Sequence, residues 1–401
     1  MKITNKITKL MLIAFIAILT FSCSTSDDNK EIVVIKSSIL DIAKADPNFS
    51  LLVAIIKITG LDIPGASTLS LPGSYTVFAP TNAAFLATPA TATLTVENVT
   101  ALKTTVPAEK ATIDFLKQVV LNHILSGAIR SNDIATGYVK TFAQYNGSST
   151  LLSMYINKTG TDVILNGGSA TVGAIGGKVV TADINASNGV IHVVDRVLLL
   201  PTLVDHVQIN PAQFSTLLSV LKSDSAGAYG DQSAVLTALS SATSNPVPSG
   251  TNTKPSLTVF APNNDAFAAA TTATGYLKGA AFSLTSTDTP PVITPNGPNF
   301  TKVLLYHVGI LNSPPPPANP IQGNLTASSA TSWSSSNVTI NTLAQNADLT
   351  NQQFKIERNS LKITENPAIT PTTPASLLRI VNIQATNGVI HTISRVLQPV
   401  L

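Results

Sequence analysis

The stretch TVFAPTNAAF at residues 76–85 decides how this chain is understood, because it occurs again as TVFAPNNDAF at residues 258–267. The β-branched and apolar residues at its start predict a short strand. Pro80 ends that strand, because proline has no N–H to donate to a sheet ladder. Thr81 then occupies the place of a helix N-cap, which Asn263 takes in the second copy. Each copy therefore predicts a strand, a turn and a helix in that order.

Two further blocks follow in the same order in both copies. LNHIL at residues 121–125 pairs with LYHVG at 305–309, and NGVIH occurs at both 188–192 and 387–391. Landmarks that repeat in one order indicate a duplicated domain. A weaker match at the start of each copy places His206 opposite Ile42, which speaks against a chemistry shared by the two copies.

The second copy is the longer one, and the boundary between the copies falls near Pro201. Its additional residues are rich in Ser, Pro and Gly and predict loops. One insertion lies within residues 240–255, and a second lies either in the proline run 314–317 or in the segment 367–374.

Periodicity and turn residues predict the other elements. Apolar residues at helical spacing predict a helix over residues 111–125, with a counterpart over 300–308. The Asn188-Gly189 pair predicts a tight hairpin turn, because both residue types tolerate positive φ, and Asn387-Gly388 repeats it. The β-branched run after each pair predicts a central strand that closes each domain.

These blocks resemble the fasciclin (FAS1) domain family. The resemblance rests on T-V-F-A-P-x-N-x-A-F, the mid-domain histidine block and N-G-V-I-H-x-x-x-R-V-L, each present twice. It implies an α+β fold with two tandem FAS1-like domains, each a wedge of two β-sheets with a helical layer. We expect these domains over residues 36–201 and 202–401, the second with the loop insertions. The fold-defining motif residues are Phe78, Pro80, Asn82, Phe85, His123, Asn188, Gly189 and His192 in the first copy, and Phe260, Pro262, Asn264, Phe267, His307, Asn387, Gly388 and His391 in the second.

The N-terminus has the features of an export signal. Three lysines precede an apolar run over residues 10–21, which is too short for the roughly 20 residues that a membrane-spanning helix needs. Cys23, the only cysteine, follows this run and resembles the cysteine of a lipobox; the alternative is a lone cysteine in an ordinary cleaved signal peptide. We expect a lipoprotein signal peptide at residues 1–22, lipidation at Cys23 and a polar tether at 23–35. The expected location is the outer membrane, lipid-anchored and facing the cell surface, with the periplasmic face as the alternative.

Composition argues against several classes of function. The net charge of +3 comes from the three signal lysines, since residues 1–22 hold no acidic residue, so the mature chain is neutral. It has no Lys/Arg cluster, which argues against nucleic-acid binding. No G-x-S-x-G elbow, phosphate loop or dinucleotide fingerprint occurs, so we expect neither an enzyme nor a cofactor.

The histidines are expected to be structural. His192 and His391 alternate with apolar residues in the predicted last strand, which favours core histidines that bond a backbone carbonyl. His123 and His307 come at the end of an apolar helix, where a ring hydrogen bond to a neighbouring loop would hold the helix end. No two histidines stand at short spacing, so no metal site is expected.

The resemblance implies extracellular, non-enzymatic work in cell adhesion and matrix interaction. We therefore expect a cell-surface adhesion or matrix- and protein-interaction module whose partner is the extracellular matrix, a surface protein or a glycan, and whose membrane contact is its lipid anchor alone. The alternative is a glycan-binding surface lipoprotein of a nutrient-capture system. Glycan sites commonly stack sugars on exposed aromatic rings, whereas aromatic residues make up only 5% of this chain and Trp333 is its one tryptophan.

Replacement of Cys23 tests the anchor. Acyl chains add about 0.8 kcal/mol of membrane affinity per buried methylene, so Cys23→Ala should move the protein from the membrane to the aqueous fraction and slow signal removal. Ser24→Ala serves as the matched control and should remain membrane-bound. Equal membrane retention of Cys23→Ala would contradict lipidation at this residue.

Overall fold

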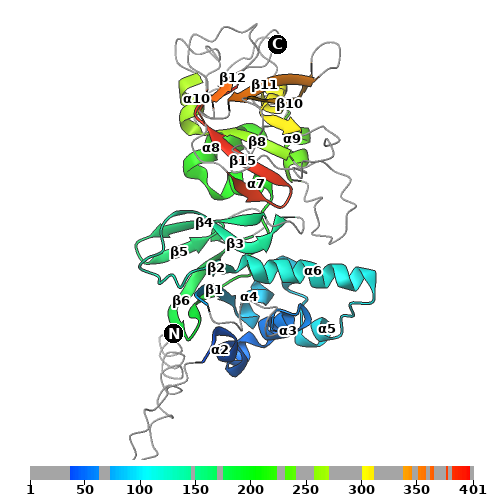
Figure 1. Cartoon of the computed structure of the whole chain (residues 1–401), viewed down its shortest axis with the longest axis vertical. Coiled ribbons are helices and arrows are strands. Elements are labelled where there is room, and N and C mark those ends of the chain that lie inside the picture. Colours follow the sequence, from blue (N-terminus) through cyan, green and yellow to red (C-terminus); the bar gives the residue numbers. More distant parts are fainter. Residues whose placement is uncertain are drawn as a thin grey trace, which may run out of the picture. The chain divides into compact units, whose positions relative to one another are not determined.

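The structure is a computed structural model (Figure 1). It describes residues 37–62, 73–145, 150–168, 175–223, 231–240, 257–270, 300–310, 337–345, 351–357, 362–364, 376–377 and 382–397. The expected signal peptide and tether, Cys23, Trp333 and nearly all of the expected insertions (241–255, 314–317 and 367–374) lie outside the described residues. Within the described ranges, no helix is long and apolar enough to cross a membrane. Ser37–Leu401 forms one compact unit.

The first domain begins with helices. They are α2 (Ile39–Ala45), α3 (Ser50–Ile58), α4 (Asn82–Ala87), α5 (Val96–Thr100) and α6 (Pro107–Asn122), with short 3-10 turns at Pro47–Phe49 and Pro89–Thr91. Thr81 is the N-cap of α4, and its side chain accepts from the Ala84 amide. Helix α6 was predicted over residues 111–125, but it begins earlier, because Pro107 suits the first helical position, and it ends at Asn122.

Seven strands of the first domain form a closed barrel. They are β1 (Tyr75–Pro80), β2 (Ile124–Ser126), β3 (Gly137–Gln144), β4 (Leu151–Thr159), β5 (Asp162–Leu165), β6 (Gly177–Ala186) and β7 (Gly189–Val194), in that spatial order. Strand β7 returns to pair in parallel with β1, next to its antiparallel partner β6, so it is a central strand. Strands β3 and β6 each pair with neighbours in both sheets and shift register along their length, so the two sheets of the expected wedge are continuous. The predicted last strand ran to residue 200, whereas β7 ends at Val194.

The second domain has a comparable set of helices and strands, but its described strands form an open sheet instead of a closed barrel. Its helices are α7 (Leu203–Ile209), α8 (Pro211–Leu221), α9 (Ser233–Ser240), α10 (Asn264–Ala270) and α11 (Phe300–Tyr306). Its strands are β8 (Leu257–Pro262), β9 (Val308–Ile310), β10 (Asn337–Gln345), β11 (Asn351–Glu357), β12 (Lys362–Thr364), β13 (Ser376–Leu377), β14 (Ile383–Ala385) and β15 (Gly388–Ile393). They form a sheet in the order β13-β12-β11-β10-β9-β8-β15-β14, in which β15 pairs in parallel with β8 as β7 does with β1.

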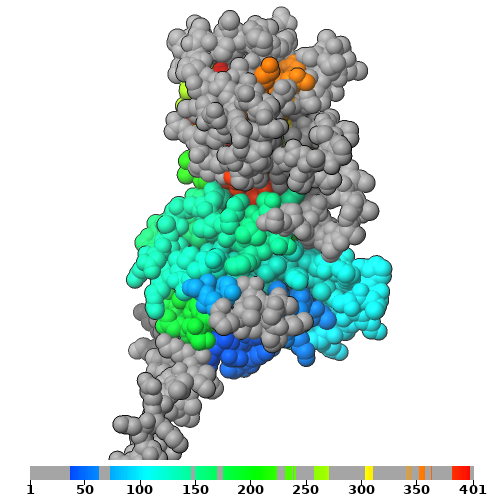
Figure 2. Space-filling model, viewed as in Figure 1, coloured from blue at the N-terminus to red at the C-terminus, as the bar shows by residue number. Residues whose placement is uncertain are grey.

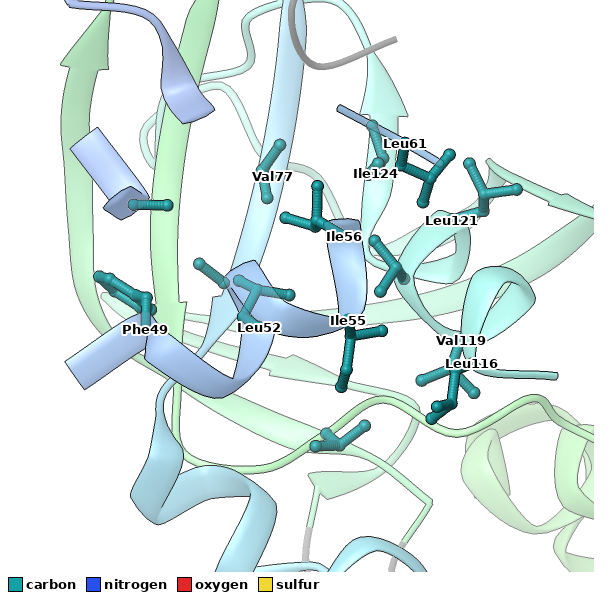
Figure 3. Packing of buried hydrophobic residues seen from close by; sticks show 14 of the residues in the cluster. Phe49, Leu52, Ile55, Ile56, Leu61, Val77, Leu116, Val119, Leu121 and Ile124 are labelled. Carbon is teal, nitrogen blue, oxygen red and sulfur yellow. The ribbon is translucent and has the colours of Figure 1, made fainter. Parts of the chain in front are cut away.

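Alternating residues of β1 divide the core of the first domain. Val77 and Ala79 face helices α3 and α6 and pack among residues such as Ile56 and Val119 (Figure 3). Phe78 points to the opposite side, into the barrel, and packs against Met154. Side chains alternate between the faces of a strand, so one strand joins the helical layer to the barrel interior. The outer surface of the helical layer is seen in blue and cyan in Figure 2.

The prediction for the Asn-Gly pairs was wrong about which residues turn. Ser187 and Asn188 form the two-residue loop between β6 and β7, and Gly189 already pairs with Ala186. Asn188 does not have positive φ, and Gly189 has φ 154°. A Cβ on Gly189 would overlap the carbonyl oxygen of Tyr75 on β1. The glycine is therefore needed for the close approach of β1 and β7, and Gly388 is placed in the same way against Leu257 of β8.

Substitution of Gly189 tests this close approach. Gly189→Val should destabilise the first domain by more than about 1 kcal/mol, because the side chain overlaps the backbone of β1. Gly137→Val is the matched control: Gly137 has φ 151°, and a Cβ there meets nothing within 4 Å. Chemical denaturation of both variants measures the difference. Equal denaturation midpoints for the two variants would show that the positive φ alone, and not the overlap with β1, causes the loss of stability.

Candidate functional site

The motif asparagine of the first block fastens two helices together. Asn82 Oδ1 accepts a hydrogen bond from the Leu51 amide at 3.0 Å, at the start of α3. Its Nδ2 donates to the Pro47 carbonyl at 3.0 Å and to Ser50 Oγ at 2.9 Å. Asn264 makes corresponding bonds to α8: its side chain accepts from the Thr216 amide and donates to the carbonyls of Pro211 and Ala212. Both ends of the amide are engaged within the domain, so this residue acts as a structural clamp.

The mid-domain histidines are internal cross-links. His123 Nε2 lies 2.9 Å from the Leu198 amide, which must donate to it, so the ring proton is on Nδ1 and donates to the Val119 carbonyl at 2.7 Å. His307 makes the same two bonds in the second domain. Burial lowers the pKa of each ring to about 4. Each neutral ring thus joins the end of a helix to the segment that follows the last strand.

The histidines of the last block have the opposite ring geometry. His192 Nδ1 accepts from the Asp183 amide at 3.2 Å, so its proton is on Nε2 and donates to the Ile129 carbonyl at 2.9 Å. The ring stacks on Phe78 with centroids 5.5 Å apart. His391 accepts from the Asn382 amide at 3.3 Å in the same way. Both nitrogens of His192 are therefore engaged by the backbone.

Ser131, Asp183 and His192 come together in the first domain, but not as a nucleophilic triad. The Ser131 amide donates to Asp183 Oδ1 at 2.8 Å, and its hydroxyl donates to the other carboxylate oxygen. These bonds lower the pKa of Asp183. The His192 ring has no lone pair left to accept the serine proton, which a triad requires. The group holds the loop after β2 in place. Its one unusual backbone feature is the positive φ of 65° at Asp183.

The asparagines of the Asn-Gly pairs cap distant helices. Asn188 Oδ1 accepts from the Ile39 amide at 2.9 Å, at the start of α2. Asn387 accepts in the same way from the Leu203 amide at the start of α7. Of the other motif residues, Pro80 and Pro262 end strands β1 and β8, and Phe78, Phe85, Phe260 and Phe267 are buried in the cores.

The cavities that the described residues enclose beside the mid-domain histidines are small. An apolar cavity of about 20 Å³ lies beside His123 in the first domain, and one of about the same size lies beside His307 in the second. Small-molecule pockets usually span about 300–1,000 Å³. In the part of the chain that the structure describes, no group of three or more His, Cys, Asp or Glu residues could hold a metal ion.

One polar cluster had no signal in the sequence motifs. This cluster joins the two domains. From the first domain come Tyr138 and Lys140 of β3 and Ser153 of β4; from the second come His206 of α7 and residues at β14. These residues do not belong to the repeated blocks, and His206 occupies the place of an isoleucine in the first copy. This difference between the copies was the one feature of the sequence that pointed to a role for His206 in the second domain alone.

Comparison with known proteins agrees with the internal duplication. A sequence model described as the Fasciclin domain matches residues 47–201 and 213–399. Protein sll1483 of Synechocystis sp. is 35% identical over 164 residues, which are 41% of this chain and 74% of that protein. The uncharacterized protein sll1735 of the same organism is 30% identical over 164 residues, 41% of this chain and 98% of that protein. A solved FAS1 domain pair from the insect cell adhesion molecule Fasciclin I covers 90% of this chain and 96% of its own, with 16% identity and a TM-score of 0.40. With two matches that together span most of its length, this chain belongs to the fasciclin domain family and carries two such domains in tandem.

Proposed function

We propose that this protein is a non-enzymatic adhesion or matrix- and protein-interaction module, held at the cell surface by a lipid on Cys23. Fasciclin domains are generally cell-adhesion or protein-interaction modules. The observation that carries the proposal is the internal use of the motif side chains. The asparagines and histidines of the three blocks bond backbone groups within their own domain in both copies. Such residues build a scaffold and leave the outer surface for recognition.

The character of the surface supports a protein or matrix partner over a glycan. In the described ranges, the exposed large hydrophobic side chains are Leu86, Val96, Val106 and Val180, all of which are aliphatic. A sugar ring is commonly bound by stacking on an aromatic face, and an aliphatic group offers none. The near-neutral, weakly charged mature chain also suits contacts that do not depend on strong electrostatic attraction.

The tandem arrangement supports weak, repeated contacts. Two modules on one tether convert the second binding event into an intramolecular one, which raises avidity without a new contact. The Pro- and Ser-rich insertions of the second domain are the expected carriers of specificity, because loops on a rigid scaffold commonly hold binding residues.

A cell-attachment assay tests the proposal. Removal of residues 314–320, or replacement of the second domain by a copy of the first, should reduce attachment to a matrix or to other cells by about tenfold or more, because both changes remove insertions that are expected to carry specificity. Deletion of residues 271–280, another segment of the second domain, is the matched control. Circular dichroism should show that every variant is folded.

One result would contradict the adhesion proposal. A strain without the protein that attaches and aggregates like its parent, yet fails to grow on one polysaccharide, would replace the adhesion proposal with glycan capture.

A further inference from the structure

The second domain has an edge strand with an outward backbone amide that is bonded by the first domain. Among the described strands, β14 lies at the end of its sheet and pairs with β15 alone. The Gln384 amide on its outer side donates to Ser153 Oγ of β4 at 2.9 Å. The Gln384 carbonyl lies 3.3 Å from His206 Nε2 of α7. A strand edge is a row of unpaired donors and acceptors, so the bond to Ser153 satisfies an amide that separation of the domains would expose. The carbonyl has its partner, His206, within the second domain.

Strand β3 supplies the other half of the contact. Tyr138 OH donates to the His206 carbonyl at 3.2 Å, and the two rings meet edge-on with centroids 5.5 Å apart. Lys140 Nζ donates to Ser153 Oγ at 2.9 Å and to the Asn382 carbonyl at 2.7 Å. We call this contact between β3, β4, α7 and β14 the joint. Beside it, Ile209 of α7 packs against Tyr155 and Ile175 of the first domain.

The joint holds two basic groups whose hydrogen-bond partners carry no charge. His206 is fully buried and its Nε2 bonds a carbonyl, whereas its Nδ1 has no hydrogen-bond partner among the residues that the structure describes. The titratable groups facing it are Tyr138 and Lys140 from β3, with Tyr155 of β4 behind Tyr138. On its own helix, the Asp205 carboxylate bonds the amide and hydroxyl of Thr202 in a capping box. Helices α8 and α9 contain no charged residue, and His391 is the titratable residue of β15.

Protonation of His206 is therefore unfavourable while the joint is closed. Burial lowers the pKa of His206 from its ordinary 6.5 to about 3, and the charge of Lys140 acts in the same direction. Burial also lowers the pKa of Lys140, to about 8, so this side chain is positively charged at neutral pH. A protonated His206 would add a second buried positive charge, and in the described ranges no carboxylate bonds the ring to balance it.

We propose that the joint is acid-sensitive: it holds the two domains together at neutral pH and opens when His206 is protonated. An open joint returns His206 to water, where the ring binds a proton more readily. Closure thus has its full strength above the ordinary pKa of 6.5 and weakens as the pH falls from there towards 3. Between pH 7.5 and pH 5.0, this linkage favours the open state by about 30-fold. Ile42 stands at this position in the first domain, so the response belongs to the second domain alone.

Hydrogen exchange on the whole chain from residue 23 onwards measures opening even where the open state is rare. The reporter is the Gln384 amide, whose partner lies across the joint. After correction for the pH dependence of intrinsic exchange, its protection should fall by about 30-fold between pH 7.5 and 5.0. His206→Gln keeps a donor for the Gln384 carbonyl but does not titrate in this range, so its protection should stay constant. His206→Ile, which restores the residue of the first copy, is a second non-titrating control.

Two results would overturn the proposal. One is equal protection of the wild-type amide at both pH values. The other is an equal loss in His206→Gln, which would assign the effect to the buried rings of His123 and His307, whose pKa values are also lowered. NMR titration of the wild-type His206 ring needs no variant: the ring should remain neutral in the closed chain to below pH 5, and titration near 6.5 would show that it is not held in the joint.

Discussion

The parallel pairing of the first and last strands of each domain is the constraint on which the rest of the structure depends. β1 and β7 are more than a hundred residues apart, yet they lie side by side from Tyr75–Gly189 to Pro80–Val194. That pairing requires a glycine at Gly189, where the carbonyl of Tyr75 leaves no room for a side chain. It also brings the first sequence block against the last, so Phe78 meets His192 and the two layers of the core share one strand.

Buried polar side chains then hold the other elements to this strand pair. A buried polar group is costly unless it is hydrogen-bonded, and the motif asparagines and histidines meet this requirement with backbone partners. His123 reaches the amide of Leu198, and Asn188 reaches that of Ile39. The second domain repeats both bonds with His307 and Asn387. The same residues that define the family thus stabilise the fold of each domain.

The joint differs in kind from these bonds because it is not duplicated. Its side chains come from strand positions outside the repeated blocks in the first domain and from His206 in the second. A bond that each domain makes for itself can be copied when a domain is duplicated, whereas a contact between the copies needs two different surfaces. The sequence shows this asymmetry at one position, where the first domain has Ile42 and the second has His206. The second domain therefore has a titratable group where the first has none.

The sequence by itself determined the duplication, the family, the order of most elements and the cap of α4, because these depend on local patterns and on their repetition. It also predicted that His192 would bond a backbone carbonyl and that His123 would bond a neighbouring loop, although not which residues supply these groups. Tertiary structure decided which groups those side chains meet: Asn188 proved to be a cap for a helix far along the chain rather than a positive-φ turn residue, and Gly189 was needed for strand approach. It also decided where α6 and β7 end, because Ile124–Ser126 joins the sheet and the residues after Val194 leave it. Local periodicity cannot report such facts, since they arise only when segments distant in sequence compete for the same space and the same hydrogen bonds.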